Sequence, residues 1–286
     1  ISLKSFKENK MSFKSNTNPM FRSKFSEDIF NHKYRHDGAE TWESLAKTLV
    51  QDVCGGIMNK TETDILAKYI AEMKFIPGGR YLYYAGRPMK FFNNCYLLKA
   101  EEDTREDWAD LSWKSESCLI TGGGIGIDYS VYRHEGAPIQ RTGGVASGPI
   151  PKMQMINEIG RRVMQGGARR SAIYASLNWQ HNDVEKFLRA KDWADMPVGS
   201  TGKTLWDIKQ EDFNFPAPLD YTNISVNYDT QWLLDYYEKG KPGKVFVENV
   251  RQAMKTAEPG FSFNFFDKEK ETLRNACTEV TSADDS

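Results

Sequence analysis

The feature that most constrains the fold of this chain is the alternation of short apolar runs with longer amphipathic stretches. Apolar runs of strand length occupy residues 91–98, 172–177, 222–227 and 261–265, and a glycine-rich turn at 121–126 leads into a further strand. Helical spacing of apolar residues occupies residues 104–119, 153–164, 184–190 and 245–256. Strands that alternate with helices of this length form parallel sheets, because each return to the same sheet edge needs a crossover. The sequence therefore predicts an α/β fold of repeated parallel strand–helix units.

The region before these units has a different character. Residues 1–40 are polar and rich in Lys, Ser and Asn, which predicts an irregular arm. Residues 41–53 and 63–73 carry apolar side chains at helical spacing and predict two amphipathic helices. We therefore divide the 286 residues into an N-terminal arm and helical region, 1–74, and an α/β region, 75–286.

Composition excludes several classes of protein. The net charge is −1, so nothing favours binding to nucleic acid or to a membrane surface. No apolar run approaches the roughly 18 to 20 residues of a membrane helix, and the first residues do not read as a signal peptide, which predicts a cytoplasmic protein. The four cysteines have no zinc-type spacing, and the four histidines have no ligand spacing, so no metal site is predicted.

One short segment near the carboxyl end carries an amide, a thiol and a carboxyl group at alternate positions: Asn275, Cys277 and Glu279. If this segment is extended, the three side chains point to one face. A nearby carboxylate raises a thiol pKa and disfavours a nucleophilic thiolate, so the set suits hydrogen-atom chemistry better. Cys277 would then stay protonated until it receives a radical, Glu279 would be a general base, and Asn275 would orient the substrate hydroxyl. The alternative is an ordinary loop with a buried cysteine and a solvated glutamate.

Three glycine-rich segments invite comparison with nucleotide motifs. Residues 199–204 end like a phosphate-binding loop, but Pro197 stands where the first glycine is required and no strand precedes the segment. Residues 122–126 precede a strand instead of following one, so they are not a dinucleotide fingerprint. Arg169 and Arg170 follow two glycines, and such a segment either binds phosphate or forms a turn with solvated arginines.

The distribution of the thiols favours a site over a loop. Cys95 lies on a predicted buried strand, and Cys277 lies on a loop that follows another. Loops at the carboxyl ends of parallel strands converge on one site. We therefore expect the two thiols to meet at the carboxyl end of the sheet.

With these residues in view, the chain resembles the catalytic (large) subunit of ribonucleotide reductase over residues 75–286. The resemblance rests on an ordered set of motifs: Asn93-Asn94-Cys95, the glycine segment 122–127, Thr142-Gly143-Gly144 within 142–149, Gly166-Gly167-Ala168-Arg169-Arg170-Ser171-Ala172, Asn223-Ile224-Ser225-Val226, Glu258-Pro259-Gly260, and Asn275-x-Cys277-x-Glu279. It implies the parallel-stranded first half of a ten-stranded α/β barrel, with the catalytic cysteine on a finger loop.

The resemblance also implies residue roles. Cys277 would be a transient thiyl radical that abstracts the ribose 3′ hydrogen, Glu279 the base on the 3′ hydroxyl, and Asn275 a hydrogen-bonding partner of the ribose. Cys95 would be one of two thiols that reduce the 2′ carbon, and a thioredoxin-like reductant would reopen the resulting disulfide. The backbone around Pro77, Asn94 and Gly126 would line the substrate pocket.

Allosteric control is implied as well. Nucleoside triphosphate effectors would bind at two loops, residues 139–148 and 166–177. Asp103 or Glu102, together with Arg133 or Arg141, would hold the effector, which would select the base that is reduced.

The resemblance leaves the radical source open between adenosylcobalamin, which the Asn-Asn-Cys and Arg-Arg-Ser-Ala motifs favour, and a separate metal-containing radical subunit. The partner of the Cys95 thiol and the second half-barrel come later in the family than Ser286. We therefore expect this chain to need a complementary C-terminal chain or region for turnover, to expose an apolar seam and a sheet edge, and to be able to form a homodimer. The alternatives are a nucleotide-binding assembly module without chemistry of its own, and a radical enzyme with another substrate.

Overall fold

The computed structural model describes residues 21–140, 143–163, 171–278 and 281–282. The chain forms two compact units, Ile1–Phe92 and Asn93–Ser286. The boundary between these compact units lies between Phe92 and Asn93. The sequence-based division after residue 74 stays a prediction. Among the described residues, no helix has the length and apolar character needed to cross a membrane.

The N-terminal unit is helical, as predicted for residues 41–53 and 63–73. Its helices are α1 (Lys24–Ile29), the π-helix η1 (Phe30–Tyr34), α2 (Trp42–Cys54), α3 (Lys60–Ala71) and α4 (Gly79–Tyr84). Helices α2 and α3 both begin with a capping box, formed by Thr41 with Ser44 and by Asn59 with Glu62. The Trp42 ring is buried between them and donates from Nε1 to the Ile70 carbonyl oxygen at 3.0 Å.

The prediction of an irregular arm was wrong for residues 24–34. Ser23 caps α1 by accepting a hydrogen bond from the Ser26 amide at 3.2 Å. Phe30 in the next turn is only 5% exposed. Its ring lies 5.6 Å from that of Phe21 and meets Trp42 edge to face, at 6.2 Å between centroids. One buried aromatic side chain therefore orders a segment whose composition is otherwise that of a loop.

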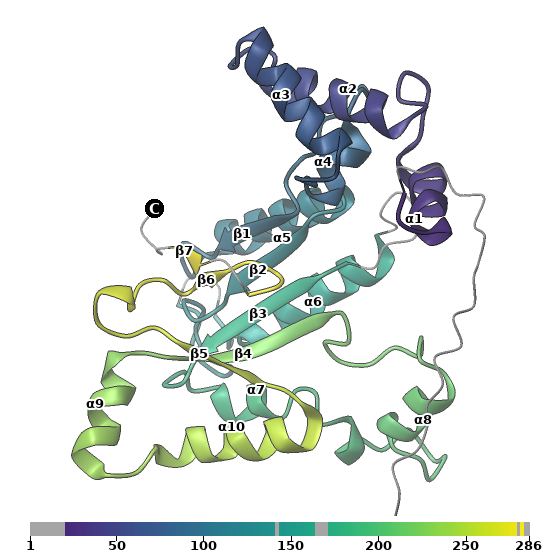
Figure 1. Ribbon diagram of the computed structural model, residues 1–286. Coiled ribbons are helices and arrows are strands. Elements are labelled where there is room, and N and C mark those ends of the chain that lie inside the picture. Colours follow the sequence, from purple (N-terminus) through teal and green to yellow (C-terminus); the bar gives the residue numbers. More distant parts are fainter. Residues whose placement is uncertain (1–20, 141–142, 164–170, 279–280, 283–286) are drawn as a thin grey trace, which may run out of the picture. The chain divides into compact units, whose positions relative to one another are not determined.

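The second unit contains one parallel sheet. Its strands are β1 (Cys95–Lys99), β2 (Gly124–Asp128), β3 (Ile173–Asn178), β4 (Thr222–Tyr228) and β5 (Gly260–Phe263). All four neighbouring pairs are parallel, and the order in the sheet equals the order in the chain (Figure 1). A separate antiparallel pair, β6 (Leu273–Arg274) and β7 (Thr281–Ser282), forms what we call the β6–β7 hairpin. The predicted half-barrel of five parallel strands is confirmed.

Helices and short helical turns follow the strands along the chain. They are α5 (Arg105–Ile120), α6 (Pro149–Arg162), α7 (Val184–Leu188), the 3-10 turn η2 (Trp193–Asp195), α8 (Leu205–Glu211), α9 (Thr230–Lys239), α10 (Gly243–Thr256) and the 3-10 turn η3 (Phe266–Lys268). Apolar residues of the strands, among them Ile125, Ile127, Leu177 and Val226, form one buried core with residues of α5, α6, α7 and α9. Burial of this face is the main stabilising contribution of the unit.

Two of these helices, α8 and α9, were not predicted. Each is ten residues or shorter and begins with its own cap: Thr204 caps α8 and Asp229 caps α9. Helix α9 is also tied to the sheet, because its Trp232 ring lies 5.0 Å from the Tyr228 ring of β4. Short helices of this kind depend on such tertiary contacts more than on periodicity.

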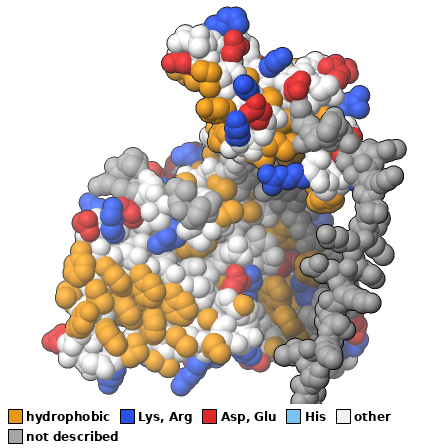
Figure 2. All heavy atoms as spheres, viewed as in Figure 1, with side chains coloured by type: hydrophobic (Ala, Val, Ile, Leu, Met, Phe, Trp, Pro, Cys, Tyr) orange, Lys and Arg blue, Asp and Glu red, His pale blue; other side chains and the backbone are white. Residues whose placement is uncertain are grey.

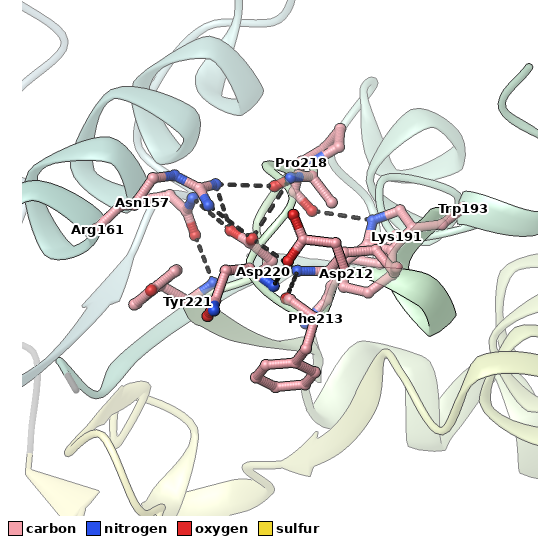
Figure 3. A network of polar contacts seen from close by, with 12 residues as sticks. Asn157, Arg161, Lys191, Trp193, Asp212, Phe213, Pro218, Asp220 and Tyr221 are labelled. Carbon is pink, nitrogen blue, oxygen red and sulfur yellow. Dashed lines mark hydrogen bonds and ion pairs between the residues drawn. The ribbon is translucent and has the colours of Figure 1, made fainter. Parts of the chain in front are cut away.

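A buried ion network fixes the connection between β3 and β4 (Figure 3). The Asp220 side chain is almost fully buried and accepts hydrogen bonds from Arg161 (2.8 Å from Nη1), Asn157 (3.2 Å) and Lys209 (3.2 Å). Burial alone would raise the pKa of Asp220, but the Arg161 and Asn157 bonds hold it below its ordinary value. The network therefore joins α6, α8 and the loop before β4.

The sheet edge at β5 carries an exposed apolar patch (Figure 2). Its members come from α9, α10 and β5 and the turn that follows: Leu234, Tyr237, Val247, Val250, Met254, Phe261, Phe263 and Phe266. Strand β5 has a neighbour on one side only among the described strands. The apolar seam and sheet edge expected from the sequence are thus present.

Candidate active site

The face of the sheet opposite the helices is lined mainly by glycine and polar residues. Because residues in register in a parallel sheet point to the same side, the strand pairing defines this inner face. Its members are Cys95, Leu97, Lys99, Gly124, Gly126, Asp128, Tyr174, Ser176, Asn178, Asn223, Ser225, Asn227, Gly260 and Ser262. Asn227 on β4 links three strands by donating from Nδ2 to Asp128 Oδ2 on β2 (3.1 Å) and to Ser176 Oγ on β3 (3.0 Å). A surface of this composition suits a polar ligand better than a packed core.

The β6–β7 hairpin crosses this inner face, and two glycines make room for it. A Cβ atom on Gly126 would lie 1.6 Å from the Arg274 carbonyl oxygen and 3.1 Å from the Asn275 carbonyl carbon. A Cβ atom on Gly124 would lie 2.7 Å from the Ala276 Cβ. In Figure 1 the hairpin passes in front of β2. Gly124 and Gly126 therefore allow the hairpin to approach the backbone of β2 closely.

The hairpin brings the two predicted thiols to the same end of the sheet. Ala276 lies against Gly124, and Gly124 is the register partner of Cys95 in the adjacent strand. Cys277 follows Ala276 directly and is exposed. The other two cysteines, Cys54 in α2 and Cys118 in α5, lie on helices, and burial raises the pKa of the Cys118 thiol. Cys95 and Cys277 are thus the pair that the fold brings together.

The expected location of this pair was wrong in one respect. Cys95 and Gly124 are the first residues of β1 and β2, and Ala276, next to Cys277, packs on Gly124, so both cysteines lie toward the amino end of the sheet and not at the carboxyl end. The expectation assumed that loops after the strands build the site. Here an inserted hairpin delivers the second thiol, and it crosses the inner face to reach the beginnings of β1 and β2.

The segment from Asn275 to Thr278 is a tight turn and not an extended strand. The Thr278 amide donates to the Asn275 carbonyl oxygen at 3.0 Å, and Thr278 has a φ of 67°. Asn275 is 3% exposed, whereas Cys277 is exposed. The prediction of one shared face is therefore wrong for these two side chains, because the turn breaks the period-two alternation. Glu279 lies outside the described residues.

The predicted substrate-lining residues have different surroundings. The Asn94 carbonyl oxygen accepts a hydrogen bond from the Gly124 amide at 2.8 Å, at the thiol end of the sheet. Gly126 is covered by the hairpin, so the structure assigns it a packing role. Pro77 belongs to the N-terminal unit, directly before α4. A contact of any of the three with a substrate stays a prediction.

Two of the predicted effector residues form a pair at the rim of a groove. Arg133 and Asp103 make an ion pair, and the Arg133 amide also donates to Asp103 Oδ2 at 3.2 Å. The groove has a volume of about 1050 Å³ and is lined by Asp103, Thr104, Arg105, Glu106, Trp108, Arg133, residues 138–140 and residues 145–148. Glu102 does not line it. Arg141, Arg169 and Arg170 lie outside the described residues.

The sequence interpretation missed the residues that hold the hairpin. Arg274 donates from Nε to Ser262 Oγ at 2.7 Å and from Nη2 to Asn264 Oδ1 at 2.9 Å. Both partners are 3% exposed. The only sequence signal was an arginine next to the Asn-x-Cys pattern, and such a residue reads as solvated until its partners are known.

Three comparisons with known proteins agree with this architecture. The family model of the ribonucleotide reductase barrel domain matches residues 93–202. A vitamin B12-dependent ribonucleoside-diphosphate reductase of Thermoplasma acidophilum is 28% identical over 68% of this chain and 24% of its own length. A ribonucleoside-diphosphate reductase large chain of Cryptosporidium parvum is 31% identical over 80% of this chain and 31% of its own length.

A solved structure supports the fold. The alpha subunit of a class Id ribonucleotide reductase from Actinobacillus ureae superimposes with a TM-score of 0.67, covering 93% of this chain and 48% of that chain, at 14% sequence identity.

The fold and the site together define a half-barrel α/β protein whose inner face is crossed by a cysteine-bearing hairpin. Residues 93–202 belong to the ribonucleotide reductase barrel-domain family, and the chain is similar to ribonucleoside-diphosphate reductases over 68% and 80% of its length in the two relatives named above. The chain spans about a quarter to a third of the length of the two curated relatives named above.

Proposed function

We propose that this chain supplies the first half of a ribonucleotide reductase active site and takes part in the thiyl-radical reduction of ribonucleotides to deoxyribonucleotides. The observation that carries the proposal is that Ala276, next to Cys277, packs on Gly124, whose register partner in the neighbouring strand is Cys95. The family relationship supports it independently. A cytoplasmic location belongs to the same proposal.

The steps follow from the chemistry of two kinds of thiol. Cys277, as a thiyl radical, takes the 3′ hydrogen atom of the ribose and becomes a thiol, while Glu279 takes the 3′ hydroxyl proton. The 2′ hydroxyl then leaves as water after protonation. Cys95 and a second thiol from a complementary region together supply two electrons and two protons and become a disulfide. Cys277 finally returns the hydrogen atom to the 3′ carbon, Glu279 returns its proton to the 3′ oxygen, and a thioredoxin-like reductant reopens the disulfide. In this scheme Asn275 binds the ribose.

In this proposal the radical is delivered to Cys277 by a cofactor or by a separate subunit. No group of His, Cys, Asp and Glu in the described part of the chain could hold a metal ion. We favour adenosylcobalamin over a metal-containing small subunit as the radical source, because B12-dependent reductases are among the relatives. Addition of each source to the assembled protein would decide between them.

The groove at the Asp103–Arg133 pair fits the proposed binding of a nucleoside triphosphate effector. Arg105 at its rim supplies an exposed guanidinium for phosphate groups. Thr104 and Ser147 add hydroxyl groups to the lining. We propose that an effector bound here, in contact with the loop at residues 139–148, biases the choice of base at the active site. A homodimer is compatible with this site.

The proposed function is tested by reduction assays of the chain mixed with a complementary C-terminal region, a thioredoxin-like reductant and a radical source. Cys277→Ser should abolish deoxynucleotide formation, and Cys95→Ser should allow no more than a single turnover. Cys118→Ser, on the helical side of the sheet, is the matched control and should retain activity. Wild-type rates in the Cys277 or Cys95 variant would refute the assignment.

The groove also favours a second candidate function, that of a nucleotide-binding assembly module without chemistry of its own. In that case effector nucleotides would bind, and the Arg133→Gln variant would lose them, but no complementary region would restore reduction. Detection of any turnover that depends on Cys277 would exclude this candidate.

A further inference from the structure

The Arg274 side chain attaches the β6–β7 hairpin to β5, the strand at the edge of the sheet. Its guanidinium makes two hydrogen bonds, from Nε to Ser262 Oγ (2.7 Å) and from Nη2 to Asn264 Oδ1 (2.9 Å). The two acceptors lie two residues apart and therefore point to the same face. Both are buried, each 3% exposed, so these bonds form away from bulk water.

The two acceptors are also held by hydrogen bonds that do not involve Arg274. Asn264 Nδ2 donates to Ser262 Oγ at 3.3 Å, and the Asn264 amide donates to the Tyr228 carbonyl oxygen at 2.9 Å. A planar guanidinium that meets two fixed acceptors has its position and its orientation determined together. A lysine ammonium, as a single point donor, would determine only its position.

The backbone of Arg274 packs on a different strand, β2, of the same inner face. The Arg274 carbonyl oxygen occupies the space that a Gly126 side chain would fill, on β2, and the guanidinium reaches the end of β5. Arg274 therefore spans the inner face over β3 and β4. Asn275 and the turn that carries Cys277 follow directly, so any rotation of Arg274 moves the thiol.

We propose that Arg274 is a positioning residue, whose paired hydrogen bonds to Ser262 and Asn264 set the location of the Cys277 thiol opposite Cys95. The inference rests on the proposed function only in giving Cys277 its chemical role. In this proposal Arg274 acts through the turn that it holds, and its guanidinium is bound to Ser262 and Asn264. Its contribution is to hold the turn in one arrangement on the inner face.

The test compares Arg274→Met and Arg274→Lys in the full chain, with Arg251→Met on the exposed face of α10 as the matched control. Two readouts report on the hairpin: amide hydrogen exchange of residues 273–278, and the mobility of a nitroxide attached at Cys277 in a background with the other three cysteines changed to serine. We expect at least tenfold faster exchange and a mobile nitroxide in Arg274→Met, an intermediate result in Arg274→Lys, and no change in the control.

Rescue separates positioning from a general structural role. Asn264→Asp should restore slow exchange to Arg274→Lys, because an ammonium and a carboxylate can pair at that site, and should not restore it to Arg274→Met. If Arg274→Met fails to fold, Asn264→Ala, which removes one acceptor, should give the intermediate exchange rate.

Exchange within twofold of wild type in Arg274→Met, or no rescue by Asn264→Asp, would overturn the inference. These readouts need no turnover, so they are independent of the Cys277→Ser reduction assay. Failure of positioning and failure of the proposed function would therefore be seen separately.

Discussion

Replacement of Gly126 by alanine should displace the β6–β7 hairpin from the sheet. The added Cβ would lie 1.6 Å from the Arg274 carbonyl oxygen and 2.8 Å from the Arg274 carbonyl carbon, and both are backbone atoms that no side-chain rotation can move away. Ordinary contact between such atoms needs about 3.5 Å, so the hairpin must move by roughly 2 Å. Alanine can adopt the backbone conformation of Gly126 without strain, because Gly126 does not have a positive φ.

The size of the effect follows from what that movement breaks. The Arg274 bonds to Ser262 and Asn264, at 2.7 and 2.9 Å, would be stretched beyond the range of a hydrogen bond. Each bond from a charged donor contributes about 1.5 to 3 kcal/mol, and partial relaxation of the hairpin recovers some of this. We take a net loss of about 3 kcal/mol, which is roughly a hundredfold change in the equilibrium between docked and released hairpin.

Hydrogen exchange of the amides in residues 273–278 measures this equilibrium directly. Gly126→Ala should accelerate their exchange by roughly a hundredfold. Gly124→Ala should accelerate it less, because the group in the way is mainly the Ala276 methyl at 2.7 Å. Gly56→Ala, where no atom lies within 4 Å of the new Cβ, is the control. Equal exchange in the Gly126 and Gly56 variants would refute the proposed packing of the hairpin on β2.

Three further predictions concern stability. Asp220→Ala should lower the free energy of unfolding in urea by about 3 to 5 kcal/mol, because the buried Lys209 would lose its carboxylate and Arg161 would keep only the exposed Glu158; a loss below 1 kcal/mol would contradict the network. Lys152 is fully buried, and burial lowers its pKa to about 8. Since the unfolded chain then holds more protons between that value and the ordinary pKa of 10.5, the free energy of unfolding of wild type relative to Lys152→Met should rise by about 2 kcal/mol from pH 7 to pH 9.5, and a pH-independent difference would contradict this. Phe30→Ala should cost about 3 to 5 kcal/mol and lower the thermal midpoint, as expected for a buried aromatic ring; a neutral effect would favour the irregular arm.

The sheet could be predicted from the sequence because its signals are local. Ile125 and Ile127 in β2, like Ile173, Ala175 and Leu177 in β3, alternate or run together within a few residues and are bounded by glycines and turns. The α1 segment could not be predicted in this way. This segment is held by the contacts of Phe30 with Phe21 and Trp42. The contact with Trp42, twelve residues later in the chain, cannot be inferred from the residues of α1.

The site was predictable in its chemistry but not in its geometry. The thiols Cys95 and Cys277 were identified from residue type and context, and the structure brings them to one end of the sheet. Which end could not be known, since it depends on the path of the hairpin over β2. Arg274 was missed for the same reason: its acceptors are ten and twelve residues earlier in the chain and become partners only when the hairpin folds back.

The glycines of β2 show where the limit of such prediction lies. Gly124 and Gly126 alternate with Ile125 and Ile127, and a strand with this pattern has one apolar face and one face without side chains. The bare face is a prediction that the sequence supports, because glycine in a strand interior weakens the strand unless something approaches closely. What fills the space has to come from another segment. Here that segment is the backbone of Arg274. The glycines of β2 therefore leave space that the hairpin fills, and a substitution in β2 or in the hairpin should change the position of the Cys277 turn.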